Sequence, residues 1–259
     1  MGDARLGIVD WGIGGLGLLG LLDQVAPGLP VTYWSDSGTV PYGMQRSAEL
    51  AARLRVVVSA LAESGCTEVV LACNAASTVV DRLQEGAGPA DVPVPVEGII
   101  THGVAVVPPM VRGVVGIVGG ARTIRSGGYR RGLTRPGREV RSRIAQPLSA
   151  HIEAGRTGTP AFVTDLRQIV APLRGADAVV LACTHYPAAA DWFAAELPGT
   201  VLLDPAAHLA AAIAARHLDA APALLADRTF TTTGDPDEMR RSAALAWKLA
   251  VPEVERRRP

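Results

Sequence analysis

Short apolar segments alternate along the chain with longer stretches rich in Ala, Leu and Arg, such as residues 47–64, 162–173 and 206–218. Most of the short segments are continuous apolar runs, which is typical of strands buried on both faces. The longer stretches have the length and composition of helices. This alternation predicts an α/β fold with mostly parallel sheets flanked by helices. The expected strands are Leu6–Asp10, Val31–Ser35, Val69–Cys73, Val94–Glu97, Val114–Val118, Val140–Ala145, Ala178–Cys183, Val201–Asp204 and Thr229–Thr233.

Two segments are expected to carry the chain between lobes: the Pro-rich segment Pro89–Pro95 and the stretch around Leu203–Pro205. We therefore expect two pseudo-symmetric lobes. The first consists of residues 1–97 and 205–259, and the second of residues 98–204. Ligands of open parallel sheets bind beyond the carboxyl ends of the strands. The interface between the lobes is thus the expected position of the active site.

Two stretches of the sequence nearly repeat each other. Residues 69–74 read Val-Val-Leu-Ala-Cys-Asn and residues 179–184 read Val-Val-Leu-Ala-Cys-Thr, so two of the three cysteines lie in matching settings. Each is expected at a helix N-terminus, where backbone N–H groups favour a thiolate. Matched thiols from two halves of a chain suggest acid/base chemistry on opposite faces of one carbon. Cys66, between a helix-like stretch and a strand, is expected to be a buried small hydrophobe.

Ionisable residues accompany these thiols. Asp10 ends the first strand, and His185 lies two positions after Cys183. A general base near each thiol would keep one as thiolate while the other stays protonated. Two simpler roles remain open, with Asp10 capping the following helix and His185 as a hydrogen-bonded loop histidine.

A glycine loop follows the first strand. Gly12, Gly14 and Gly17 have G-x-G-x-x-G spacing, and Asp36 ends the second strand. This pattern fits a dinucleotide site, but that interpretation leaves the paired cysteines unexplained. The glycines also suit a close approach of backbone amides to a substrate carboxylate. A zinc site of Cys73, Cys183 and His185 is conceivable, although nothing in the spacing demands it, and no metal is expected.

Composition narrows the classes of function. The 25 basic and 25 acidic residues cancel, which gives no reason to expect nucleic acid or an anionic membrane as partner. The chain contains neither a run of about 20 apolar residues nor a signal-peptide pattern, and its cysteines lack CxxC spacing. We expect a cytoplasmic protein with reduced thiols and a small-molecule substrate. Lys248 is the only lysine, which argues against pyridoxal phosphate, and the arginines at 256–258 are expected to form a solvated tail.

The motifs together resemble the glutamate racemase family of the aspartate/glutamate racemase superfamily, nearly end to end. The most specific of them are the C-N-x-A-S box at Cys73 and the C-T-H-Y-P box at Cys183. Four further segments are similar to family motifs: Gly7–Leu16, Ser35–Gly43, Gly119–Ser126 and Thr233–Pro236.

The resemblance implies a cofactor-independent amino-acid racemase, expected to be a homodimer, in a family that supplies D-amino acids for peptidoglycan. Cys73 and Cys183 would be the two acid/bases, assisted by Asp10 and His185, with Glu153 near the second cysteine. The positions matching substrate-binding residues are Trp11, Pro41, Tyr42, Gly43, Asn74, Ala75, Thr123 and Thr184.

Two of these positions depart from the family pattern. Trp11 replaces a family serine and Ala75 replaces a threonine, and both family residues contact the polar head of the amino acid. A pocket built around hydrogen bonds loses much of its selectivity when a partner is missing. Three alternatives therefore stay open. The chain could be an isomerase or decarboxylase of a different carbon acid in a specialised biosynthetic pathway, an inactive binding or regulatory homologue, or an NAD-binding protein that uses the glycine loop.

Overall fold

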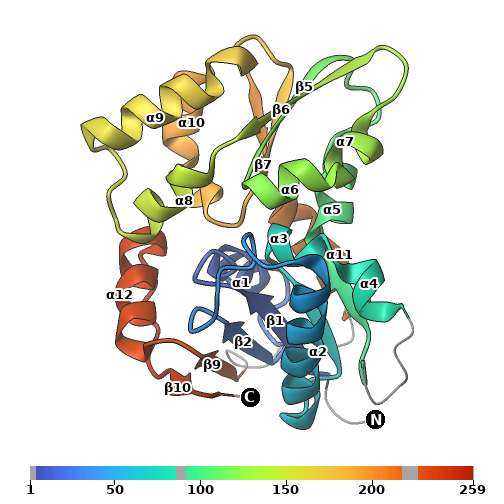
Figure 1. Cartoon of the computed structure of the whole chain (residues 1–259), viewed down its shortest axis with the longest axis vertical. Helices are drawn as coiled ribbons and strands as arrows, with labels where there is room; N and C mark the ends of the chain where they lie inside the picture. Colours follow the sequence, from blue (N-terminus) through green and yellow to red (C-terminus); the bar gives the residue numbers. More distant parts are fainter. Residues whose placement is uncertain (1–3, 86–91, 218–226, 259) are drawn as a thin grey trace.

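The computed structural model describes residues 4–85, 92–217 and 227–258, which form an α/β structure with two parallel sheets (Figure 1). The six-stranded sheet has the order β10-β9-β2-β1-β3-β4, and the four-stranded sheet has the order β6-β5-β7-β8. We refer to the parts built on them as the six-stranded lobe and the four-stranded lobe. The strands are β1 (Leu6–Asp10), β2 (Val31–Ser35), β3 (Glu68–Leu71), β4 (Val96–Gly98), β5 (Gly113–Gly119), β6 (Arg138–Ile144), β7 (Ala178–Ala182), β8 (Val201–Leu203), β9 (Arg228–Thr232) and β10 (Glu255–Arg256).

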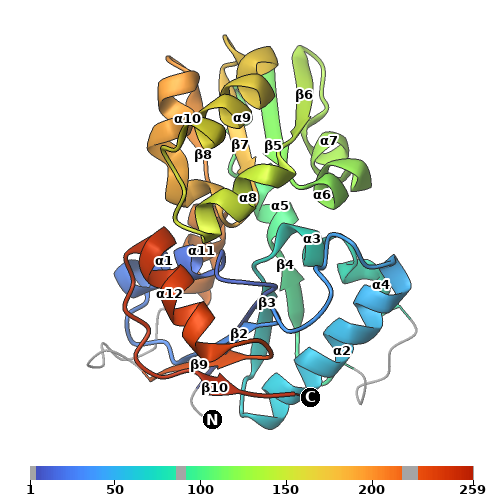
Figure 2. The ribbon, with the colours of Figure 1, turned by 60° about the vertical axis from the view of Figure 1, so that its left-hand side comes forward.

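Helices cover both faces of each sheet (Figures 1 and 2). The helices are α1 (Leu16–Val25), α2 (Ser47–Glu63), α3 (Asn74–Ser77), α4 (Val80–Gln84), α5 (Ile99–Ala105), α6 (Ala121–Ser126), α7 (Gly128–Leu133), α8 (Gln146–Glu153), α9 (Pro160–Val170), α10 (Ala190–Glu196), α11 (Pro205–Arg216) and α12 (Pro236–Trp247), with 3-10 turns η1 (Ala171–Leu173) and η2 (Tyr186–Ala189). The predicted α/β class with parallel sheets is confirmed.

The continuous apolar runs are explained by burial on both faces. In β1, Leu6 and Ile8 enter the core cluster under α1 and α11, whereas Val9 enters the cluster under α2. In β7, Val179 and Leu181 face α9, and Val180 faces the opposite cluster. Burial of each such side chain contributes roughly 1.5–3 kcal/mol to the free energy of folding. Packing on both faces therefore stabilises each sheet.

The chain crosses between the lobes through two helices, α5 and α11, which pack against each other. His102 Nδ1 of α5 lies 3.0 Å from His208 Nδ1 of α11. The expectation that Pro89–Pro95 forms a crossing is wrong for its described part, residues 92–95. These residues lead into β4, which pairs with β3 in the same sheet, so the chain leaves this lobe only after Gly98.

Strand ends differ from the sequence predictions in a way that matters for the site. β3 ends at Leu71 and β7 at Ala182, so both candidate cysteines lie just outside their strands. The chain's last strand was not predicted: Glu255 and Arg256 pair with β9, where a solvated tail was expected. Their side chains are exposed, and this pairing uses only the backbone, which leaves no apolar pattern to read.

Candidate active site

Cys73 lies at the junction of β3 and α3. It is the N-cap residue of α3, as the sequence predicted, and its backbone carbonyl accepts from Ser77 N at 3.0 Å. Burial raises the pKa of the Cys73 thiol, and the neighbouring Asp10 carboxylate raises it further. The thiol is therefore held in its protonated form in the absence of substrate.

Cys183 directly follows β7 in the other lobe. No helix begins at it, because the turn η2 starts at Tyr186 with His185 as its N-cap, so the expected helix N-terminus at this cysteine is wrong. Its Sγ atom lies 3.9 Å from His185 Nδ1. On the far side of the ring, His185 Nε2 lies 3.5 Å from Glu153 Oε2 at the end of α8. The three side chains form a line from carboxylate through imidazole to thiol.

The protonation of His185 follows from this line. Burial by itself lowers the pKa of the imidazole, but the contacts with Cys183 and Glu153 outweigh it and hold the pKa well above its usual value. An imidazolium at this point places a positive charge beside the Cys183 sulfur. That charge stabilises a negative sulfur once the thiol has given up its proton.

Asp10 connects the two lobes. Its Oδ1 accepts a hydrogen bond from Gly12 N at 2.9 Å, and its Oδ2 accepts one from Thr184 Oγ1 at 2.9 Å. Burial raises the pKa of the Asp10 carboxyl, although the positive charge of His185 acts in the opposite direction. The N-cap of α1 is Gly15, so the simpler role of Asp10 as that helix cap is excluded.

Asn74 follows Cys73 and has one free donor. Its Oδ1 accepts a hydrogen bond from Tyr129 OH of the four-stranded lobe at 2.6 Å. Its Nδ2 is buried and has no partner among the described residues. Buried donors are normally satisfied, so this amide is suited to a ligand oxygen.

The glycine loop is explained by contacts between protein segments. A Cβ at Gly14 would lie 2.2 Å from Thr184 Oγ1, and one at Gly12 would lie 2.9 Å from Glu153 Oε1. Gly17 similarly makes room for the ring of Trp247. The spacing that suggested a dinucleotide therefore lets Thr184 and Glu153 of the other lobe, and Trp247 of the same lobe, approach the backbone.

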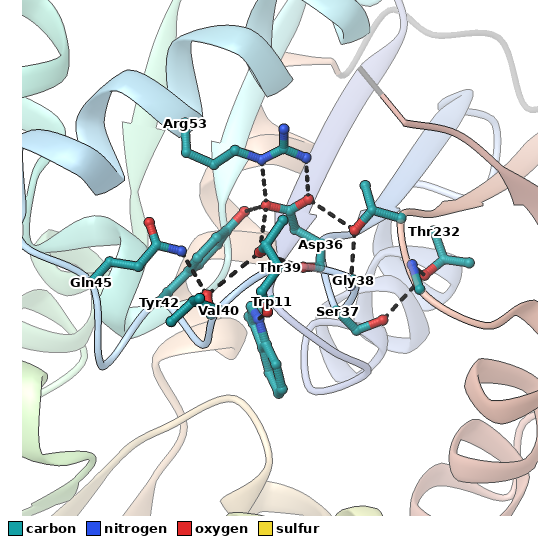
Figure 3. Close-up of polar contacts among 12 residues, drawn as sticks. Trp11, Asp36, Ser37, Gly38, Thr39, Val40, Tyr42, Gln45, Arg53 and Thr232 are labelled. Atoms are coloured by element: carbon teal, nitrogen blue, oxygen red, sulfur yellow. Dashed lines mark hydrogen bonds and ion pairs between the residues drawn. The ribbon is translucent and has the colours of Figure 1, made fainter.

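Asp36, the other half of the dinucleotide pattern, is fully buried and already paired (Figure 3). The guanidinium of Arg53 donates to its two oxygens at 2.6 and 2.9 Å, and Tyr42 OH donates to Oδ2 at 2.8 Å. No carboxylate oxygen is left for a ribose. The Tyr42 side chain is buried in the lobe and holds the loop that carries Pro41 and Gly43.

Trp11 lies at the boundary of the lobes (Figure 3). Its Nε1 donates to the Thr39 carbonyl at 3.1 Å, and its ring packs against the core cluster that Cys73 and Ala75 also contact. The same indole lines a cavity of about 160 Å³ together with Glu153. The two departures from the family pattern, Trp11 and Ala75, thus pack against the same core cluster.

Sequence reasoning missed two residues that join the lobes, Arg122 and Tyr129. Both belong to the four-stranded lobe and donate to the six-stranded lobe. Arg122 stands in the Gly119–Ser126 motif, but the family resemblance indicates only its neighbour Thr123, which is buried on α6, as a site residue. The contact partners of Arg122 are more than 40 positions away in sequence, so no local signal identified them.

No group of three or more His, Cys, Asp or Glu side chains within residues 4–85, 92–217 and 227–258 has an arrangement that could hold a metal ion. Among these same residues, no helix combines the length and apolar character that crossing a bilayer requires.

The chain is similar in sequence to known racemases. A family model described as Asp/Glu/Hydantoin racemase matches residues 20–213. The chain is 32% identical over 255 residues to a glutamate racemase of Pseudomonas entomophila, covering 94% of each protein. It is 33% identical over 225 residues to one of Desulforudis audaxviator, covering 85% of this chain and 80% of that one.

Solved structures of glutamate racemases have a similar fold. Glutamate racemase from Thermus thermophilus, in complex with β-chloro-D-alanine, superposes with a TM-score of 0.85 at 28% identity, covering 98% of this chain and 97% of that one. For the fold alone, the Francisella tularensis enzyme gives a TM-score of 0.87 at 22% identity, covering 100% and 98%. The fold and the site define an isomerase of the Asp/Glu/hydantoin racemase class. Within that class, the chain belongs to the glutamate racemase family.

Proposed function

We propose that the chain interconverts L- and D-glutamate by proton transfer between two cysteines, without a cofactor. One observation carries the proposal. Cys73 and Cys183 follow equivalent strands, β3 and β7, each second from one edge of its sheet. The Asp10–Thr184 hydrogen bond joins the end of β1, which pairs with β3, to the residue after Cys183. Two acid/base groups contributed by facing lobes can act on opposite faces of one α-carbon.

In the proposed reaction, one cysteine thiolate takes the α-proton, so the C–H bond breaks and an S–H bond forms. The electron pair left on the α-carbon is delocalised into the carboxylate. The other cysteine, as a thiol, then gives its proton to the opposite face and becomes a thiolate. The roles of Cys73 and Cys183 are exchanged after each turnover, which makes the enzyme competent in both directions.

The surrounding residues support these roles. His185, oriented by Glu153, stabilises negative charge on Cys183. The buried carboxyl of Asp10, whose charge acts on the Cys73 thiol, is the proposed acid/base partner of Cys73. The free Nδ2 of Asn74 is suited to the substrate carboxylate, where it would stabilise the charge that develops in the transition state.

Substitution of each cysteine tests the mechanism. Cys73→Ser and Cys183→Ser should each lower racemisation by about 10²-fold or more, the usual worth of a positioned acid or base. Cys66→Ala, which alters a buried thiol outside the site, is the matched control and should keep wild-type activity. Full α-proton exchange in deuterated water by both serine variants would show that the mechanism is wrong.

A second candidate keeps the two thiols and changes the substrate. Trp11 and Ala75 lack the hydroxyls that the family pattern supplies, which favours a different carbon acid and an isomerisation or decarboxylation. A panel of carboxylates analysed by chiral chromatography decides between the candidates, because turnover of glutamate at ordinary enzyme rates would exclude the second.

We also propose that the two lobes correspond to about residues 1–97 with 205–259 and residues 98–204, with the first boundary at the end of β4, and that the enzyme forms a homodimer. Light scattering during size-exclusion chromatography tests the second point, with twice the chain mass of 26.9 kDa as the expected result.

A further inference from the structure

Arg122 joins the lobes by a contact that the proposed mechanism does not use. From α6 it donates three hydrogen bonds, and all three acceptors belong to the six-stranded lobe. Nε donates to Thr78 Oγ1 at 2.7 Å, Nη1 to the Gln45 carbonyl at 2.6 Å, and Nη2 to Ser47 Oγ at 2.9 Å. The planar guanidinium fork holds three acceptors at once, which a lysine ammonium does not reproduce.

The acceptors belong to two segments that lie beside the candidate site. Thr78 is the C-cap of α3, the short helix that begins at Cys73. Gln45 and Ser47 directly follow the loop that carries Pro41 and Gly43. One side chain of the four-stranded lobe therefore binds two segments of the other lobe, the end of α3 and the start of α2.

The loop that precedes Gln45 is held to its own lobe by hydrogen bonds (Figure 3). Asp36 holds it at its start through Arg53 and Tyr42, and the Gln45 side chain donates to the Val40 carbonyl at 2.6 Å. The loop is thus tied to its own lobe and moves with it. The three Arg122 bonds then form or break when the lobes move relative to each other.

The chemistry of these bonds suits a reversible contact. The acceptors are two hydroxyls and a carbonyl, and no carboxylate lies within ion-pair distance of Arg122 in the described parts of the chain. Ser47 is exposed, so water can replace its bond to Arg122. Arg53, by contrast, is paired with a buried carboxylate that water does not reach. Figures 1 and 2 show α6 and α12 at opposite sides of the lobe boundary, so Arg122 closes the side that α12 leaves free.

We propose that Arg122 is a positioning residue that latches the two lobes in the reacting arrangement and releases them for exchange of substrate and product. The inference rests on the proposed two-thiol reaction for its kinetic consequences, but the closure itself is independent of the substrate.

Arg122→Gln and Arg122→Lys test the latch, with Arg125→Gln as the matched control on the exposed face of the same helix. Loss of bonds to a charged donor should raise the KM for glutamate roughly 10- to 100-fold in both Arg122 variants and leave the control unchanged. Without substrate, alkylation of Cys73 by iodoacetamide should be on the order of tenfold faster in both, because the lobes open more often.

Ser47→Ala provides a second arm that does not disturb the fold, since the Ser47 side chain is exposed. It should raise KM less than Arg122→Gln, and the double variant should be no worse than Arg122→Gln alone. Additive effects, or Arg122 variants with wild-type KM and wild-type alkylation of Cys73, would overturn the latch. Failure of the wild type to racemise glutamate would instead contradict the proposed function, and the alkylation rates would still decide whether Arg122 holds the lobes together.

Discussion

Asp10 Oδ2 accepts a hydrogen bond from Thr184 Oγ1 at 2.9 Å, which joins the end of β1 in one lobe to the residue after Cys183 in the other. The carboxyl that neighbours the first candidate cysteine is therefore positioned by the motif of the second. A shift of either lobe changes the surroundings of both thiols. Closure of the lobes and the protonation of the thiols are therefore coupled in this site.

Asp10→Asn should stabilise the protein and impair catalysis. The amide can keep the bonds to Gly12 and Thr184 while removing a charge whose burial raises the pKa of the carboxyl. A raised pKa means that the charged form is disfavoured in the folded state, so the penalty is complete above the raised pKa and is lost as the pH falls to the ordinary pKa of an unfolded carboxyl. We expect a higher melting temperature at pH 7–8, a difference that vanishes in acid, and at least about 10²-fold lower racemisation.

Thr184→Val is the control for this prediction, because it removes the hydrogen bond and keeps the charge. It should lower the melting temperature at neutral pH, opposite in sign to Asp10→Asn. An Asp10→Asn variant that melts below the wild type at neutral pH would show that the buried carboxylate stabilises the fold.

Glu153→Gln should shift the alkaline limb of the activity profile to lower pH. The contacts with Cys183 and Glu153 hold the pKa of His185 well above its usual value, so the imidazolium persists at neutral pH and is lost as pH rises through the raised pKa. Removing the carboxylate removes one of these raising contacts. The pH dependence of kcat/KM checks this, and an alkaline limb that is unchanged in Glu153→Gln would exclude His185 as the titrating group.

Arg53→Met should destabilise the six-stranded lobe by about 3 kcal/mol, because it leaves the fully buried Asp36 carboxylate without its cation. Urea denaturation measures the loss. Arg46→Met, which breaks the exposed pair with Glu49, should cause no measurable change and serves as the control. Equal losses in the two variants would mean that the Asp36–Arg53 pair contributes no more than a surface ion pair.

The double variant Trp11→Ser, Ala75→Thr should lower the KM for glutamate. It replaces the Trp11 indole and restores two hydroxyls, each able to bond a charged head group. A fall in KM of roughly tenfold or more is expected. Trp11→Phe keeps the bulk of the ring and loses only the bond to the Thr39 carbonyl, so it should not improve KM. No change in the double variant would show that the indole lies outside the substrate pocket.

Much of the fold could be predicted from the sequence, because strands buried on both faces leave continuous apolar runs. The run at 178–183 marked β7 to within one residue. β10 left no such signal, since two exposed residues pair through their backbone alone. The prediction of a helix N-terminus at Cys183 was wrong for a related reason. An apolar run shows where a strand ends but does not show whether a helix begins there.

The site was only partly accessible to sequence reasoning. The matched cysteine boxes predict both thiols as site residues, and the proximity of His185 to Cys183 follows from their spacing of two residues. The contacts of Arg122 with Gln45, Ser47 and Thr78 arise from the packing of one lobe on the other, which no local pattern encodes. Likewise, the GxGxxG spacing looked like a nucleotide loop because close approach by a protein side chain and by a phosphate both require glycine.

The most direct test of the two-thiol account is the isotope content of early products in deuterated water. Starting from L-glutamate, the account predicts that D-glutamate formed in the first few per cent of conversion carries deuterium at the α-carbon, while the remaining L-glutamate keeps its protium. This follows because the thiol that protonates the opposite face has exchanged with solvent. Early D-glutamate that retains the original protium would require one base acting on both faces, and it would contradict the assignment of Cys73 and Cys183 as separate proton carriers.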